Sequence, residues 1–300
     1  MSSTLTGARM SYAAALIASV GYGVYVVLAY QCIRRLVRRT QTWTLGRVAL
    51  LTYTSLLFAL QTIYFVAGCK WSEIEFVESS VDPAVFASQQ SSMLAVLKDT
   101  VYTVNIWVAD IFLLYRAYII WGGHYICLAP FITYLGALAT GIGLLVEISK
   151  PGAAFGQVAV IDFGTPFWSL SVTTNVLSTI LIAGRLTYRR RAMYRIQQNQ
   201  ENYRVHSNTT ASAIFAESAA MYAIVALIYI PLFARNLTLQ YPFSALMGAV
   251  VSIAPTLIIL RMAGGKAVTR EWSNIPLTAV NAIPSSQRES HVASTDKTVC

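Results

Sequence analysis

The chain has 300 residues, of which 56% are hydrophobic and only 12% are charged, and its mean hydropathy is +0.55. A soluble globular domain carries about 25% charged residues, so this composition excludes an ordinary soluble protein and indicates a chain that lies largely in lipid. A net charge of +9 often accompanies nucleic-acid binding, but membrane topology explains it better here. We therefore expect the lipid bilayer as the main partner and no nucleic acid.

Seven apolar stretches are long enough to cross a bilayer, because a spanning helix needs about 20 apolar residues. They predict an all-α membrane protein, a seven-transmembrane helix bundle. The predicted helices cover residues 11–33, 48–69, 96–121, 125–148, 165–188, 212–235 and 241–262. Residues 1–265 then form one transmembrane domain. Residues 266–300 are polar and rich in serine and threonine, which predicts a disordered cytoplasmic tail.

Basic residues gather in every second connection between the predicted helices. Cytoplasmic loops retain lysine and arginine, so the arginines at residues 34–47, 116 and 185–204 are expected to face the cytosol, together with the basic tail. The acidic residues at 73–82 then lie outside. This pattern predicts an outer N-terminus and a cytoplasmic C-terminus, in the plasma membrane. The basic inner face is expected to attract anionic lipid.

Asp110 is the acidic residue closest to the centre of a predicted span. Counting back from Trp121 at 1.5 Å per residue places Asp110 about 16 Å into the membrane, where an ionisable group is costly. Asn105 on the same helix and Asn175 on the fifth predicted helix carry amides that could hydrogen-bond to Asp110. The cluster is either a contact for a ligand or cation, or a polar clasp between helices.

Arg116 and Glu217 are predicted to lie at similar depths near the cytoplasmic side, on the third and sixth helices. An ion pair between them would form a latch that holds the two helices together and opens on activation, as a two-state switch requires. The alternatives are a permanent structural pair, or two side chains that each extend to the cytoplasmic interface.

Pro231 and Pro255 lie inside the sixth and seventh predicted helices. Proline in a spanning helix frees a backbone carbonyl and permits a kink, so both are candidate kinks. Five tryptophans fall near the predicted interfaces and are expected to form an aromatic belt: Trp43, Trp71, Trp121, Trp168 and Trp272.

Several classes of chemistry lack their residues in this sequence. The seventh predicted helix has no lysine for a retinal Schiff base, and no helix carries His-Glu-x-x-His or another cluster of histidines with carboxylates that would hold a metal. The seven helices also leave no room for a soluble catalytic domain. We therefore expect no enzyme, no catalytic residue, no cofactor and no metal.

Three stretches carry a family resemblance: Ala109–Gly122, Ala216–Tyr222 and Ala254–Arg261. They resemble a large group of seven-helix membrane proteins from mushroom-forming fungi, which implies the seven-helix fold and brings no assigned activity. The arrangement is also distantly similar to a G protein-coupled receptor, with an arginine at the inner end of the third helix and an acid on the sixth. The motifs Asp-Arg-Tyr and Asn-Pro-x-x-Tyr and the cysteine at the top of the third helix, which are typical of rhodopsin-like receptors, are missing.

Together these features predict a receptor-like membrane protein. It would sense a small extracellular ligand through rearrangement of the third and sixth helices and pass the signal to a cytoplasmic partner. The alternative is a transporter or channel-like protein for a small solute or ion, which requires a continuous polar path through the bundle.

Overall fold

The computed structural model of the chain describes residues 2–38, 45–78, 93–122, 125–150, 157–197 and 206–261. Within these ranges, side chains are described for residues 6–38, 45–78, 93–122, 125–150, 157–188 and 220–260. The predicted tail, residues 266–300, and the tryptophans at positions 43 and 272 lie outside the described residues.

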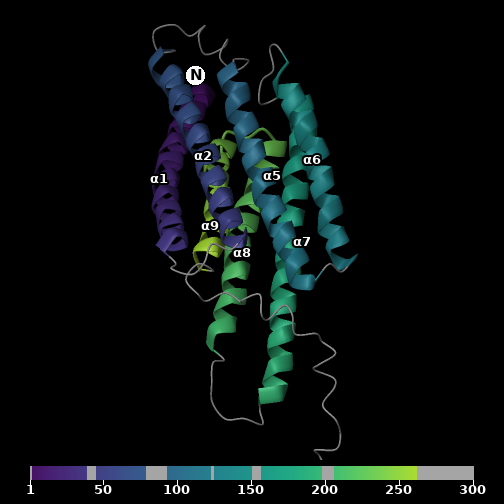
Figure 1. Cartoon of the computed structure of the whole chain (residues 1–300). Helices are drawn as coiled ribbons and strands as arrows, with labels where there is room; N and C mark the ends of the chain where they lie inside the picture. The colour runs from purple at the N-terminus through teal and green to yellow at the C-terminus, as the bar shows by residue number, and fades with distance from the viewer. Residues whose placement is uncertain are drawn as a thin grey trace, which may run out of the picture.

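The described part of the chain is helical and contains no β-strand. Seven α-helices follow one another through it, with a π-helical turn η1 (Ile74–Glu78) and a short 3-10 turn η2 (Tyr125–Cys127) between them (Figure 1). The α-helices are α1 (Ser2–Arg38), α2 (Leu45–Glu73), α5 (Met93–Trp121), α6 (Leu128–Ile148), α7 (Val158–Gln197), α8 (His206–Ala234) and α9 (Gln240–Arg261). Each overlaps one of the seven ranges predicted from the sequence.

Six of these helices are long and apolar enough to cross a membrane, namely α1, α2 with η1, α5, η2 with α6, α7 and α9. In α8 the described side chains begin at residue 220, and the remaining Ala220–Ala234 is an apolar helix shorter than a full span. The lengths and compositions of the six helices are those of an integral membrane protein.

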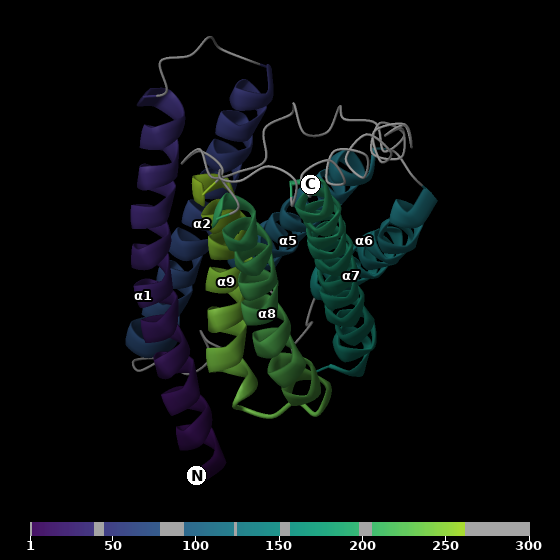
Figure 2. The same cartoon turned by 90° about the horizontal axis from the view of Figure 1, so that it is seen from below.

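The helices form a closed bundle with α5 near its centre. α1 packs along α2 and α9, α6 packs along α7, and α8 packs along α7 and α9. α5 packs along α2, α6, α7 and α9, so α7 and α9 separate it from α8. In Figure 2, α1 and α2 lie on one side of the molecule, α6 and α7 lie on the other, and α8 and α9 lie between them.

Apolar side chains cover the outside of this bundle, and its interior combines an apolar core with several buried polar side chains. On α1, Tyr12, Leu16, Val20, Val24 and Val27 are all exposed, and their spacing of three or four residues places them on one face. In the most apolar part of α1 only 11% of the residues are buried, whereas 72% are buried in the most apolar part of α9. The exposed apolar face of α1 therefore suits contact with lipid, and α9 belongs to the core.

Small residues allow α1 and α9 to approach closely. A Cβ atom added to Gly21 would lie 2.7 Å from the Cβ of Ala249 on α9, closer than two carbon atoms can pack. Glycine at this position lets the two helix backbones come together, which is a common way to associate helices in lipid.

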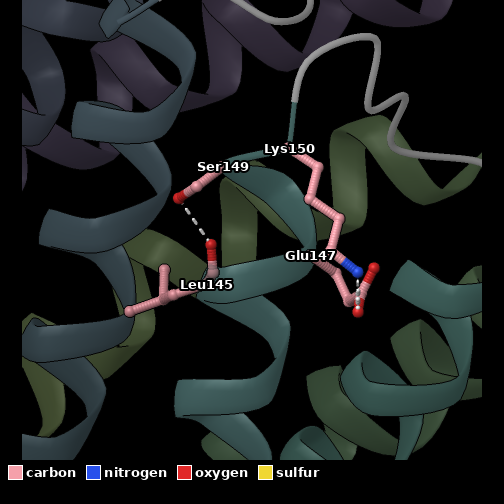
Figure 3. A network of polar contacts seen from close by, with 4 residues as sticks. All are labelled: Leu145, Glu147, Ser149 and Lys150. Atoms are coloured by element: carbon pink, nitrogen blue, oxygen red, sulfur yellow. Dashed lines mark hydrogen bonds and ion pairs between the residues drawn. The ribbon is translucent and has the colours of Figure 1, made fainter.

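A glycine caps the C-terminal end of α5. Gly122 has a φ of +70°, and its N–H donates to the carbonyls of Tyr118 and Ile119 at 3.0 and 3.3 Å. A left-handed glycine is the usual C-terminal cap of a helix. At the opposite end of the bundle, α6 ends with the Ser149 hydroxyl donating to the Leu145 carbonyl at 2.7 Å and with Lys150 2.6 Å from Glu147 (Figure 3).

Several helix ends differ from the prediction, and at two of them a neighbouring residue bears on the difference. The second predicted helix ends at residue 69, but α2 continues to Glu73 and then into η1, because Lys70 forms ion pairs with Glu73 at 3.1 Å and Glu78 at 3.5 Å. The fifth was predicted to begin at residue 165, next to Pro166, but α7 begins at Val158 and contains Pro166. A proline costs a spanning helix one backbone hydrogen bond, which neighbouring groups can replace.

Candidate functional site

Asp110 lies at a junction of three helices. The carboxylate is 2% exposed, and its Oδ2 accepts a hydrogen bond of 2.6 Å from the hydroxyl of Ser171 on α7. The Ser171 hydroxyl is also 2.9 Å from the hydroxyl of Tyr222 on α8. Because Ser171 has one proton and donates it to Asp110, Tyr222 is the donor in the second bond. We call Asp110, Ser171 and Tyr222 the Asp110 cluster; it connects α5 to α8 through α7.

A small cavity adjoins the Asp110 cluster. It has a volume of about 20 Å³, measured as the space open to the centre of a water molecule. Its polar lining comes from Asp110, Asn175, Thr179 and Tyr222, and the remaining lining is apolar. Since one water centre needs roughly 10–15 Å³, the cavity holds one or two waters and no organic ligand in this state.

Asn175 supplies the second buried polar group of the cavity. It lies on α7 four residues after Ser171, so both side chains fall on the same face of that helix. Asn175 is 7% exposed, and its Oδ1 atom has no hydrogen-bond partner among the described residues. An oxygen in that position is available to a donor or a cation that enters the cavity.

Asn105 belongs to a different cluster. Its amide nitrogen donates to Gln61 on α2 at 3.0 Å and to Ser252 on α9 at 2.8 Å, and Ser252 donates to Gln61 at 2.8 Å. Five residues separate Asn105 from Asp110, and at 3.6 residues per turn they point about 140° apart around α5. Asn105 is fully buried as predicted, but it clasps α2, α5 and α9 instead of reaching Asp110.

The structure describes the side chain of only one of the two predicted latch residues. The Arg116 guanidinium carbon lies 5.1 Å from the centre of the Phe112 ring, which stacks on Tyr53 of α2 at 4.4 Å. Glu217 lies on α8, but its side chain is outside the described residues. The ion pair between Arg116 and Glu217 stays a prediction.

The two predicted kink prolines lie inside α8 and α9. Pro255 is buried and lines the cavity beside Asp110, whereas Pro231 is exposed on α8. One of the two prolines is therefore part of the candidate site, and it places a missing backbone hydrogen bond at the wall of the cavity.

Some of the arginines assigned to the cytoplasmic face stabilise the bundle itself. Arg47 on α2 donates to the carbonyls of Leu36 at 2.6 Å and Val37 at 2.8 Å, which have no partners further along α1. Arg185 on α7 is 8% exposed, and its guanidinium carbon lies 4.9 Å from the centre of the Trp121 ring. These two side chains contribute to contacts between helices. The expected attraction of anionic lipid therefore depends on the other basic residues.

Trp168 does not belong to an aromatic belt, contrary to the prediction. It is 3% exposed, and its ring lies 5.4 Å from that of Tyr102 and 5.3 Å from that of Tyr229. The position of Trp168 along α7 suits an interfacial residue, but its side chain lies on the face of α7 that turns toward the core.

Comparison with known proteins does not add a function. No protein-family model matches the chain, and no curated protein is significantly similar to it. The site therefore has to be interpreted from its own geometry.

Proposed function

We propose that the protein is a receptor-like membrane protein with seven spans, and that the Asp110 cluster and its cavity are the element that changes on activation. The main observation behind the proposal is a chain of two hydrogen bonds that joins α5 to α8 through Ser171, beside a cavity. A contact of this kind has a second arrangement within reach, because breaking the bond between Tyr222 and Ser171 disconnects α8 from the chain.

The proposal counts α8 as the seventh span. Its helix runs from His206 to Ala234, a length of 29 residues, and about 20 residues are enough to cross the hydrocarbon core. An odd number of spans places the two termini of the bundle on opposite sides. The cytoplasmic side is the one where α1, α5 and α7 end, with Arg34, Arg35 and Arg38 in the last turns of α1 (Figure 1).

The outer side carries the acidic residues of α2 and η1. Glu75 accepts a hydrogen bond of 2.7 Å from Ser11 of α1, and Glu73 and Glu78 pair with Lys70. These contacts order the outer ends of α1 and α2, on the side where an extracellular ligand would arrive.

Activation in this proposal is a movement of α8 away from α5. A ligand larger than two water molecules cannot occupy the closed cavity, so its binding requires this movement, and the differential affinity drives the change. Pro255 at the cavity wall and Pro231 in α8 lower the cost of bending the two helices.

The spacing along α5 and α8 supports the proposed latch. Arg116 lies six residues beyond Asp110 on α5, about 9 Å toward the cytoplasm, and Glu217 lies five residues before Tyr222 on α8, about 7.5 Å in the same direction. The latch would then form one level below the Asp110 cluster, and both contacts would break together. We propose it as the second half of the same switch.

The movement can be measured by the distance between spin labels on the inner halves of α5 and α8. Tyr118 and Ala220 are exposed and suit cysteine labelling in a background without the native cysteines. We expect Tyr222→Phe, which removes the donor to Ser171, and Glu217→Gln each to add a population at longer distance in lipid nanodiscs. Tyr188→Phe, an exposed tyrosine of α7, is the control. Identical distance distributions in all variants would remove the switch.

Ligand sensing is tested separately by a thermal-shift screen of small molecules on the purified protein. Hits that act through the cavity should lose their stabilisation in Asp110→Asn and keep it in Asp99→Asn, which changes another carboxylate of α5. A screen whose hits all ignore Asp110 would argue against this cavity as the ligand site.

One observation favours the alternative of a transporter or channel-like protein. Polar groups continue from the Gln61 and Ser252 contact along α9 to Thr256, whose hydroxyl donates to the Ser252 carbonyl at 2.8 Å, next to Pro255 at the cavity wall. Such a string could carry an ion if it opened at both ends. Flux into proteoliposomes that disappears in Asp110→Asn would support this alternative over the receptor.

A further inference from the structure

We infer that the cavity beside Asp110 binds a monovalent cation of about the size of sodium, together with at most one water. The inference concerns ion binding to the closed bundle, and it holds whether or not the protein signals. Three features of the cavity support it: its charge, an amide oxygen that has no donor in the described part of the chain, and its size.

The first feature is a buried carboxylate without a positive partner. Asp110 is 2% exposed, and within the described ranges no ion pair joins it to a lysine, arginine or histidine. The Ser171 hydroxyl donates to it, but a neutral donor does not cancel its charge. An isolated ionised carboxylate in a bundle interior is very costly, so the charge must be neutralised by a proton or by a cation.

The second feature is the Oδ1 atom of Asn175. The Asn175 side chain lines the same cavity, and its Oδ1 atom is buried and has no hydrogen-bond donor among the described residues. Leaving such an oxygen buried without a partner is unfavourable, because its desolvation is not compensated. A proton on Asp110 would remove the charge but would leave Asn175 to a separate donor such as a water, whereas one cation in the cavity neutralises the carboxylate and accepts coordination from the amide oxygen.

The third feature is the size and chemistry of the cavity. Its volume of about 20 Å³ admits one or two particles the size of a water molecule. Its polar groups are a carboxylate, an amide and the hydroxyls of Thr179 and Tyr222, with no sulfur or imidazole, a set that suits a hard cation.

The valence follows from the same features. Calcium takes six to eight oxygen ligands and magnesium keeps several waters, for which a cavity of about 20 Å³ has no room. A divalent ion would also leave a net positive charge beside a single carboxylate. A monovalent ion balances Asp110 one to one.

Binding would connect the four helices that surround the cavity. Asp110 comes from α5, Asn175 and Thr179 come from α7, Tyr222 comes from α8, and Pro255 comes from α9. A cation held among these groups binds the closed bundle and not an expanded one. Its binding therefore shifts the equilibrium between the two states toward the closed bundle.

The test is the thermal stability of the purified protein as sodium replaces choline at constant chloride concentration and constant ionic strength. We expect the midpoint of unfolding to rise with sodium and to saturate, and to rise less with the larger potassium ion. Asp110→Asn, which is neutral and nearly the same size, should abolish the sodium dependence. Asp99→Asn should leave it intact, and Asn175→Ala should raise the sodium concentration at half-saturation several-fold.

Binding of radioactive ²²Na⁺ to the folded wild-type protein gives a second readout that does not depend on how the variants fold. Saturable binding that cold sodium displaces and choline does not would support the site. The inference is overturned if stability and ²²Na⁺ binding show no specific sodium effect, or if Asp110→Asn keeps that effect. It is also overturned if the midpoint of unfolding depends on pH in the wild type but not in Asp110→Asn, and depends on no cation. That result would show that a proton neutralises the carboxylate.

Discussion

Ser171 is the residue on which both hydrogen bonds of the Asp110 cluster depend. Its hydroxyl donates to Asp110 and accepts from Tyr222, so Ser171→Ala removes two bonds and leaves a buried carboxylate oxygen without a donor. We expect this change to destabilise the protein by about 1–3 kcal/mol, measured as a lower midpoint of thermal unfolding in detergent.

Ser169→Ala is the matched control for this prediction. Ser169 lies on the same helix and is half-buried, but its hydroxyl donates to the Thr165 carbonyl of its own helix at 2.8 Å. Its removal should change the midpoint of unfolding by much less. Equal effects of the two substitutions would show that the Asp110 cluster adds no stability of its own.

The sequence identified part of the candidate site at this scale. Asp110 and Asn175 were chosen because polar groups at membrane depth are costly, and both lie at the cavity. The sequence does not identify Ser171, Tyr222 or Gln61 as site residues. Uncharged polar side chains are common in spanning helices and cost little until they are buried. The signal that could have found Ser171 is its four-residue spacing from Asn175, which places both on one face of the helix.

At the scale of helices, two glycines of α1 offer a direct comparison. A Cβ atom at Gly21 would overlap Ala249 of α9 at 2.7 Å, whereas a Cβ atom at Gly23 meets nothing within 4 Å. Gly21→Ala should therefore destabilise the protein by about 1–3 kcal/mol through overpacking.

Gly23→Ala should be neutral or stabilise the protein by up to about 1 kcal/mol, because alanine is the better helix former. The measurement is the midpoint of thermal unfolding of both variants in the same detergent. If Gly21→Ala is as stable as Gly23→Ala, α1 and α9 are not packed as closely as described here.

The positions of the helices followed from the sequence, but several of their ends did not. Apolar runs mark where helices cross lipid, and each of the seven predicted ranges overlaps an observed helix. Helix ends depend on polar contacts between neighbours, such as the pairing of Lys70 with Glu73 and Glu78 that accompanies the extension of α2. The sequence alone does not show which acidic side chain pairs with which basic one.

At the scale of the whole molecule, the bundle combines an apolar outer face with polar side chains buried in its core. Exposed apolar side chains follow the outer face of α1, and the polar residues Thr54, Gln61, Asn105 and Asp110 are each at most 4% exposed. The hydropathy of the sequence indicated lipid around the bundle. It could not show which face of each helix turns inward, because helices that are apolar nearly all round carry little directional pattern.

Cys69 gives a test of the proposed orientation in intact cells. It is exposed and lies near the C-terminal end of α2, while Cys32 and Cys127 are buried. We expect a maleimide reagent that cannot cross membranes to label the protein in sealed cells, and Cys69→Ser to abolish that labelling. Labelling that requires permeabilised cells would place this end of α2 in the cytosol and reverse the topology.

α7 and α8 extend past the other helices at the end where α5 terminates (Figure 1). From Tyr222 to His206, α8 spans 16 residues, or about 24 Å. If α8 tilts as a rigid rod by about 10°, a point at that distance from the hinge moves by about 4 Å. The protruding ends of α7 and α8 would thus convert a small rotation beside one buried carboxylate into a displacement that another macromolecule can detect.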